Sequence, residues 1–493
     1  MRGFSATGNI NMKIVQEGGL EPLSRLLLSQ DSAVLQETTA CLCNLSLGDE
    51  NKFEICKSGA VAPLIALMES EDSFVAQCAC ECLANVAEMN DNQEAISQEG
   101  AIIPCIKAMR SRHIEVMRES SRLLSNLCAC DSPFGADQIV ENRGHDLLIS
   151  FLISQDLNCQ RNGAFGIGNL CTHDHHRVVL MNAGVLEPLS SLARSGKVEL
   201  EIRRFCMLAL ANFASSFKTH DAFVSHHSAK MLVSFSNSND SELRNYAAFT
   251  VAKLAANSDM MEIITDEGGL EPVLFLARSD DKRVQKHALK ALTTLSFLES
   301  NKEAICTVLP SISDFINDKS DANSQLACCA VANLAEAGRN LTCIVQHGCI
   351  PLIVEALDSP SEAVQREAAR AVGNVSVNID YCEALIRHGA APRLISIFQS
   401  RNCECQKMVA LALSNLSVNI LSHPDLIKSG IITLVRTECL ASLDPKRFSD
   451  HETVRFCILT ICNLTGNKNN HAMMVEFIGK CGDTVCMQCT YRS

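Results

Sequence analysis

Nine asparagines recur at nearly constant spacing, and their side chains could bind an extended peptide backbone. Each sits in a small–apolar–Asn–apolar pattern, as in CLCNLS and AVGNVS: Asn44, Asn85, Asn126, Asn169, Asn212, Asn333, Asn374, Asn415 and Asn463. A carboxamide both donates and accepts hydrogen bonds, as an extended backbone requires. The series lapses at Lys253 and Thr294, which predicts two binding stretches separated by a weaker centre. The structural alternative is that these asparagines only cap helix ends or tolerate turns.

Basic residues recur four and eight positions before these asparagines, on nearly the same helix face. With Lys253, they are Arg118, Arg122, Arg161, Arg204, Lys286, Lys290, Arg366, Arg370, Lys407 and Arg455. These eleven basic residues meet one acidic residue, Glu81, on the same face, so we expect a local charge near +10 in a chain of net charge −13. Arginine can bind a carboxylate or phosphate with two hydrogen bonds, which favours acidic or phosphorylated segments. The alternative is that acidic neighbours neutralise these side chains.

Two local groups of residues could ligate a metal ion. One is Cys171, His173, Asp174, His175 and His176, in a predicted polar turn, and the other is Cys481, Cys486 and Cys489. Zinc ligands usually come in spaced pairs, which neither group supplies. The sequence also has no phosphate-binding glycine loop, no HExxH and no nucleophile elbow. We therefore expect no metal, no cofactor and no catalytic activity.

The asparagines belong to a repeat of about 41 residues, the step from Asn44 to Asn85. A glycine precedes most of them by about 25 residues, at Gly19, Gly59, Gly100, Gly144, Gly184, Gly269, Gly348, Gly389 and Gly430. Glycine fits a sharp turn with positive φ. Each unit is therefore predicted to be a short helix, a glycine turn, a second helix, a polar loop and a longer third helix that ends near the asparagine. Such units bury their apolar faces only by stacking.

The segments NKEAI, VQREAARAVGNVS and CEALIRHGAAPRLI, within residues 301–395, resemble the armadillo repeats of β-catenin and importin-α, and are most similar to those of the vacuolar armadillo scaffold of fungi. The resemblance covers nearly the whole chain and implies an all-α fold, a right-handed α-solenoid with three helices per unit. It also implies that the third helices line a concave surface. We expect a continuous array of about eleven repeats over residues 1–480, incomplete at both ends, and a disordered Cys-containing tail at 481–493.

Composition narrows the function to protein binding. The net charge of −13 argues against a nucleic-acid partner, and no apolar run is long enough for membrane insertion. The 26 cysteines are scattered through helical patterns, as buried free thiols would be, which indicates a reducing, cytoplasmic location. Attachment to an organelle membrane, the cytoskeleton or a flagellum through partners, and a nuclear location, stay open. The incomplete end repeats predict missing repeats or a partner that covers them.

The predicted function is a non-enzymatic scaffold or adaptor that binds extended acidic or phosphorylated segments of other proteins. We expect charge reversal of Arg161, Arg204 and Arg366 to abolish this binding without unfolding the array. One alternative is an importin-α-like nuclear import adaptor, but the importin pattern pairs asparagine with tryptophan, and this chain has no tryptophan. The other alternative is an armadillo protein that tethers a membrane or the cytoskeleton.

Overall fold

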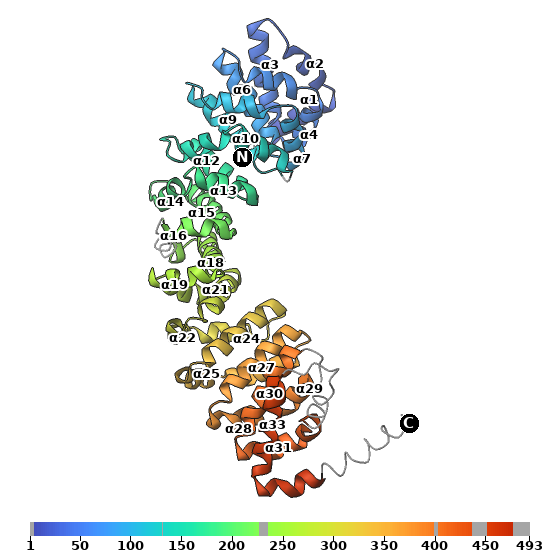
Figure 1. Ribbon diagram of the computed structural model, residues 1–493. Helices are drawn as coiled ribbons and strands as arrows, with labels where there is room; N and C mark the ends of the chain where they lie inside the picture. The colour runs from blue at the N-terminus through green and yellow to red at the C-terminus, as the bar shows by residue number, and fades with distance from the viewer. Residues whose placement is uncertain (1–3, 131, 226–234, 399–402, 436–450, 477–493) are drawn as a thin grey trace. The chain divides into compact units, whose positions relative to one another are not determined.

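The computed structural model describes residues 4–130, 132–225, 235–398, 403–435 and 451–476. These residues form α-helices and short 3-10 helices and contain no strand (Figure 1), which confirms the all-α prediction. The chain divides into two compact units, Met1–Thr250 and Val251–Ser493, each described by itself. A single continuous array over residues 1–480 stays a prediction, and the tail at 481–493 lies outside the described residues.

The first unit repeats the predicted order of three helices. Its first helices are α1 (Phe4–Gln16), α4 (Asp49–Lys57), α7 (Asn90–Gln98), α10 (Pro133–Glu141), α13 (Asp174–Asn182), and η1 (Phe217–Thr219) followed by α16 (His220–Ser225). Its second helices are α2 (Leu20–Leu26), α5 (Val61–Leu67), α8 (Ile102–Ala108), α11 (Gly144–Leu152) and α14 (Leu186–Arg194). Its third helices are α3 (Ser32–Leu45), α6 (Ser73–Val86), α9 (Ile114–Leu127), α12 (Leu157–Leu170) and α15 (Leu200–Ala214).

The boundary between the units falls inside α18 (Ser241–Ala255), and the second unit continues the same order. Its first helices are α19 (Ser258–Asp266), α22 (Glu299–Cys306), η2 (Gly338–Asn340) with α25 (Leu341–Gln346), α28 (Ile379–Arg387), η4 (Ile420–Ser422) with α31 (His423–Lys428), and η5 (Lys468–Asn470). Its second helices are α20 (Leu270–Ala277), α23 (Leu309–Ser313), α26 (Cys349–Glu355) with η3 (Ala356–Asp358), and α29 (Ala390–Phe398). Its third helices are α21 (Lys282–Leu295), α24 (Asp321–Ala335), α27 (Glu362–Val375), α30 (Cys403–Leu416) and α33 (His451–Gly466).

Third helices of consecutive repeats pack against one another within each unit, from α3 to α15 and from α21 to α33. Their inner faces bury apolar side chains completely, as at Leu83, Leu124 and Ile167. Aspartate caps the N-termini of several of them, because its carboxylate accepts hydrogen bonds from backbone N–H groups that the helix leaves unpaired. Asp31, Asp72 and Asp156 are examples.

The predicted glycine turns are correct at Gly59, Gly100, Gly184, Gly348, Gly389 and Gly430, which all have positive φ. Three predicted positions are wrong. At the two Gly-Gly pairs the positive φ belongs to Gly18 and Gly268, whereas a Cβ on Gly19 or Gly269 would lie within 2.7 Å of the preceding helix. At the third wrong position, Gly144, the positive φ belongs to the preceding residue, Arg143. Gly144 is needed for close packing instead, since a Cβ there would lie 3.0 Å from Ile106.

The described cysteines are free and mostly buried, as the sequence predicts. Burial raises the pKa of Cys80 and of Cys82 to about 12, because a thiolate is poorly solvated among apolar side chains. Among the described residues, no single helix is long and apolar enough to span a bilayer. Only Gly338–Gln346 together with Cys349–Asp358, two segments bent by 89°, reach the required length and composition.

Candidate peptide-binding surface

The repeated asparagines lie one to three residues before the ends of the third helices, and most of them bond to the preceding repeat. We call the side chains at these positions, and at the positions four and eight residues before them, the third-helix face. The amide nitrogen Nδ2 of Asn126 donates to the carbonyl oxygen of Ala84 at 2.9 Å, and Asn374 donates in the same way to Ala332 at 2.8 Å. The corresponding bonds join Asn169 to Ser125, Asn212 to Gly168, and Asn415 to Gly373.

Three other asparagines donate a hydrogen bond to a serine hydroxyl of the preceding repeat. Asn85 Nδ2 donates to Ser46 Oγ at 2.9 Å, Asn333 to Ser296 at 2.9 Å, and Asn463 to Ser417 at 3.0 Å. Asn44, in the first repeat of the series, is exposed. The asparagines therefore join neighbouring repeats, a role that differs from the helix capping considered as their structural alternative.

The inter-repeat bonds leave acceptor capacity on this face. Within the described part of the chain, no hydrogen bond is accepted by the Oδ1 atoms of Asn126, Asn169, Asn212, Asn374 and Asn415, and all five side chains are half-buried. Each Nδ2 also carries a second hydrogen. The bond to the neighbouring repeat thus holds each amide in one orientation without using all of its hydrogen-bonding capacity.

Five of the seven basic residues eight positions before the asparagines, or before the equivalent Thr294, pair with acids at the start of the next third helix. Arg118 binds Asp156, with Nη2 2.6 Å and Nε 2.9 Å from Oδ2, and Arg161 binds Glu201 with two hydrogen bonds of 2.8 and 2.9 Å. The same arrangement pairs Arg204 with Asp240, Arg366 with Glu404, and Lys407 with Glu452. The hydrogen bond from Arg118 lowers the pKa of Asp156, and the one from Arg161 lowers the pKa of Glu201.

The two arginines four positions before the asparagines occupy equivalent networks in the two units. Arg122 contacts Glu119 at 2.7 Å and Glu88 at 3.0 Å, and Glu88 also contacts Lys52 at 2.6 Å. In the second unit Arg370 contacts Glu367 at 2.9 Å and Glu336 at 3.2 Å, and Glu336 contacts Lys302 at 2.9 Å. Arg370 also donates to Asn333 Oδ1 at 2.8 Å.

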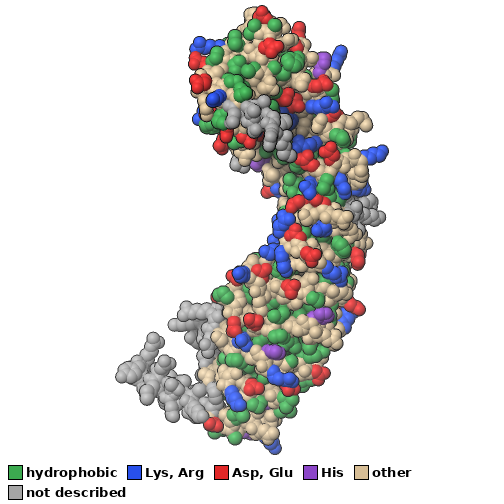
Figure 2. Space-filling model, turned by 180° about the vertical axis from the view of Figure 1, so that it is seen from behind, with side chains coloured by type: hydrophobic (Ala, Val, Ile, Leu, Met, Phe, Trp, Pro, Cys, Tyr) green, Lys and Arg blue, Asp and Glu red, His purple; other side chains and the backbone are tan. Residues whose placement is uncertain are grey.

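The predicted excess of positive charge is therefore largely offset by acids outside the positions that the sequence pattern selects. On the side of the molecule that Figure 2 presents, basic and acidic side chains are interspersed. Lys286, Lys290 and Arg455 are exposed. The backbone N–H of Ser320 and the nearby charge of Lys286 both lower the pKa of Asp318, so Lys286 interacts with an acid just before α24. Lys253, at an asparagine position, is also exposed. Two of these four exposed basic residues, Lys286 and Lys290, lie on α21.

A hollow of about 180 Å³ opens on the third-helix face of the first unit. It is lined by Glu88, Arg122, Asn126, Arg161, Asn162, Phe165 and Phe205. The two phenylalanine rings lie 5.0 Å apart, and the guanidinium of Arg161 lies 5.7 Å from the centre of the Phe205 ring. The hollow is smaller than typical pockets for drug-sized ligands and suits one side chain of a bound peptide.

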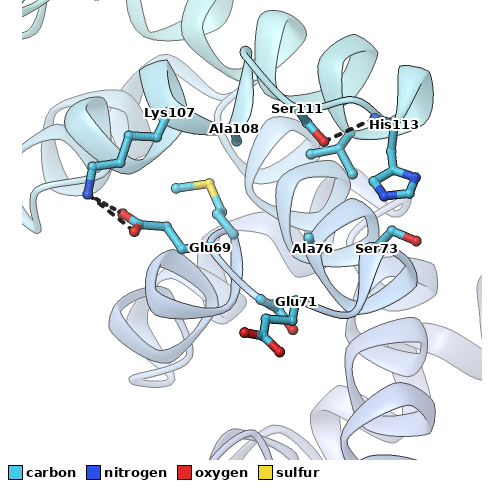
Figure 3. Close-up of a pocket in the computed structure, with 11 residues that line it drawn as sticks. Glu69, Glu71, Ser73, Ala76, Lys107, Ala108, Ser111 and His113 are labelled. Carbon is cyan, nitrogen blue, oxygen red and sulfur yellow. Dashed lines mark hydrogen bonds and ion pairs between the residues drawn. The ribbon is translucent and has the colours of Figure 1, made fainter.

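A second hollow, of about 230 Å³, lies between the second repeat and the third, among the loops that precede α6 and α9. Figure 3 shows the ion pair of Lys107 with Glu69 at its rim, 3.0 Å long, and the hydrogen bond between Ser111 and His113. Of its polar side chains, Glu69 and Lys107 pair with each other, while Figure 3 draws no interaction for Glu71 or Ser73. It contains none of the predicted site residues.

The histidine-rich turn has a partner that the sequence analysis missed. His175 and His176 both lie within hydrogen-bonding distance of Asp137, which is on α10 of the preceding repeat. Cys171 is buried, and Asp174 pairs with Arg177. No local pattern marks Asp137, because it is 38 residues away from His175 in the sequence. Cys481, Cys486 and Cys489 lie outside the described residues.

Comparisons with known proteins agree with the repeat structure. The family model of the armadillo/β-catenin-like repeat matches residues 12–47, 339–377 and 378–418. An engineered protein of known structure is similar at 28% identity, with a TM-score of 0.73 over 80% of this chain and 98% of that chain. A structure from work on a phosphorylation switch that controls the interaction between cadherin and β-catenin has a TM-score of 0.75 at 15% identity, over 94% and 96% of the two chains. At that identity the likeness concerns the fold alone. No curated protein matches the sequence.

Proposed function

We propose that this armadillo-repeat protein is a non-enzymatic scaffold whose third-helix face binds extended, acidic or phosphorylated segments of other proteins. Protein binding is the general role that the armadillo repeats and the all-α solenoid support. Stacked repeats present long surfaces made of equivalent positions, and such surfaces suit an extended partner. The orientation of the asparagine amides by neighbouring repeats is the observation that carries the proposal.

The asparagines supply the binding groups for a peptide backbone. An extended segment has unpaired N–H and C=O groups along its length, and the free Oδ1 atoms on this face could accept from its N–H groups. Because the bond from Nδ2 to the preceding repeat already fixes the amide, little side-chain entropy is lost when a partner binds. Successive asparagines, such as Asn374 and Asn415, belong to third helices that pack directly against each other.

The charges on the face favour an acidic partner, although not at every arginine. A carboxylate that reached Arg161 would have to replace Glu201, so one ion pair would be exchanged for another with little net gain. A phosphate dianion carries more charge than the carboxylate it displaces. Lys286 and Lys290 are both exposed, and the charge of Lys286 acts on Asp318 without a hydrogen bond between them, so an incoming acid has less to displace there than at Arg161. We therefore propose α21 as the main electrostatic contact.

The hollow beside Asn126 would hold one side chain of a segment bound to the first unit. Phe165 and Phe205 offer apolar contact there, while Arg161 and Arg122 lie at the same hollow. An aromatic or aliphatic residue flanked by acidic ones fits this combination. Anchoring a side chain in a pocket of this kind is a common source of binding energy in protein interfaces.

The test compares two double variants that change the net charge equally. Lys286→Glu with Lys290→Glu reverses the two lysines of the third-helix face, and Lys319→Glu with Lys428→Glu reverses two exposed lysines of the same unit outside it. Fluorescence anisotropy with a labelled, extended phosphopeptide rich in Glu, measured over a range of salt concentrations, gives the affinity of each. We expect the first variant to bind at least about 10-fold more weakly and the second to bind like the wild type, because screening leaves only nearby charges effective.

Equal affinities for both variants, or stronger binding of a Lys-rich peptide than of the acidic one, would contradict the proposal. Charge reversal at Arg161, Arg204 and Arg366 is a poorer test than the sequence suggested. Each of these arginines bonds to an acid of the next repeat, so reversal would place two negative charges together and weaken repeat stacking as well as binding.

A further inference from the structure

Three potential metal ligands converge between two first helices of the first unit. Asp137 lies on α10, and His175 and His176 lie in the first turn of α13. The Nε2 atoms of the two histidines are 2.8 and 2.9 Å from the same oxygen, Oδ1 of Asp137. The ligating atoms of all three residues lie within 4.8 Å of one another. This cluster is separate from the third-helix face.

The local structure holds the cluster in place. The ring of His176 is 2% exposed, which leaves it little freedom to rotate away, whereas His175 is 61% and Asp137 42% exposed, so that solvent reaches the site. The rings of His175 and His176 are 4.0 Å apart. The ring of His173, at the N-cap of α13, is 5.4 Å from that of His176 and is the nearest candidate for a further ligand.

We propose that Asp137, His175 and His176 form a binding site for a divalent transition-metal ion of the zinc class, which links the first helices of adjacent repeats. Imidazole and carboxylate groups are common ligands of zinc. A metal ion here would replace a shared hydrogen-bond acceptor by three bonds to one centre. The site would thereby stabilise the stacking of α10 on α13.

The geometry requires little rearrangement. Zinc–ligand bonds of about 2.0–2.1 Å in a tetrahedron place neighbouring ligand atoms about 3.3 Å apart. The two observed separations of 2.8 and 2.9 Å would therefore open by about half an ångström, a shift within reach of the exposed side chains of Asp137 and His175. Water or His173 would take the fourth position.

The experiment uses the whole chain, treated with a chelator, and titrates it with Co²⁺ and Zn²⁺. Isothermal titration calorimetry gives the affinity and stoichiometry, and the Co²⁺ absorption spectrum reports the ligands, because thiolates produce intense charge-transfer bands that imidazole and carboxylate do not. This matters in a chain with 26 cysteines. We expect one ion per chain bound without thiolate bands, and a melting temperature that rises with Zn²⁺.

The decisive variants are Asp137→Asn and His175→Ala, which alter a half-buried and an exposed side chain and leave the buried His176 intact. Each is expected to bind at least about 10-fold more weakly and to lose the melting shift. Matched controls are Asp146→Asn, an aspartate of the same unit, and His388→Ala, an exposed histidine; both should bind like the wild type. The proposal is overturned if the wild type binds no Co²⁺, if its spectrum shows thiolate ligation, or if all four variants bind equally.

Discussion

Arg118 binds the carboxylate that caps the third helix of the next repeat, Asp156. One carboxylate oxygen, Oδ1, accepts a hydrogen bond of 3.0 Å from the backbone N–H of Cys159, while Oδ2 accepts from the guanidinium of Arg118 at 2.6 Å. A single aspartate thus begins one helix and joins it to the preceding repeat. Gln36 and Asp72 form the same link at 2.6 Å, and so do Arg204 and Asp240.

Replacement of Asp156 should cost more stability than replacement of an aspartate that only caps. The carboxylate of Asp31 accepts hydrogen bonds from two backbone N–H groups at the start of α3. We expect Asp31→Ala to lower the free energy of unfolding by about 1 kcal/mol, the usual value of a cap. Asp156→Ala removes both the helix cap and a charge-assisted hydrogen bond, so we expect the free energy of unfolding to fall by about 2 kcal/mol or more. Urea unfolding followed by circular dichroism measures both, and equal losses would show that the inter-repeat bond contributes nothing.

The same pairs should make stability depend on pH in the acid range. Hydrogen bonds from Arg118 and Arg204 lower the pKa of Asp156 and of Asp240 below that of an unfolded aspartate, about 3.9. Their contribution to stability is therefore complete above that pH and is lost as the pH falls through the lowered folded-state pKa. The double variant Asp156→Asn with Asp240→Asn cannot titrate. Its deficit relative to the wild type should be largest at neutral pH and should shrink below about pH 4; a deficit independent of pH would contradict this account.

The two equivalent networks should respond alike to loss of their central glutamate. Glu88 and Glu336 each bridge an arginine of the third-helix face to a lysine whose side chain is only 6% or 5% exposed. We expect Glu88→Gln and Glu336→Gln each to lower the free energy of unfolding by about 1–2 kcal/mol, because a buried ammonium loses one of its two carboxylates.

Glu69→Gln is the matched control for these two variants. Glu69 pairs with Lys107, whose side chain is 58% exposed, and both remain accessible to water. Exposed ion pairs contribute little to stability, so we expect this variant to lose less than about 1 kcal/mol of unfolding free energy. Chemical denaturation of the three variants under the same conditions makes the comparison, and similar losses in all three would remove any special role of the buried lysines.

The amide of Asn374 should stabilise the stacking of repeats independently of any partner. Asn374→Ala removes the 2.8 Å hydrogen bond to Ala332, so we expect the free energy of unfolding to fall by about 1 kcal/mol. Asn374→Asp should cost more, because a carboxylate would then face a carbonyl oxygen. Thr294→Ala is the control: Thr294 occupies the same position in its repeat but donates only to Lys290 of its own helix. Thermal melts that rank the alanine and aspartate variants in the opposite order would contradict this reading.

Much of the fold can be predicted from the repeat alone. The order of three helices, the third helices ending near Asn85 or Asn374, and most glycine turns follow from local patterns. At Gly19 and Gly269 the error is one residue, because the preceding glycine takes the positive φ and the second packs against the end of the preceding helix. At Gly144 the cause is non-local: the glycine allows close approach to Ile106, 38 residues earlier, and this requirement resembles a turn signal in the sequence.

The repeating unit and the residues that share the third-helix face can be predicted from short-range periodicity in the amino-acid sequence. What those residues contact depends on how the repeats stack. Arg118 meets Asp156 38 residues away, Asn374 meets Ala332 42 residues away, and Asp137 meets His175 38 residues away. Each contact depends on how far one repeat is rotated and shifted on the next. That rotation results from the packing of buried side chains over whole helices, so a stripe predicted to be positive becomes a series of ion pairs when the repeats stack.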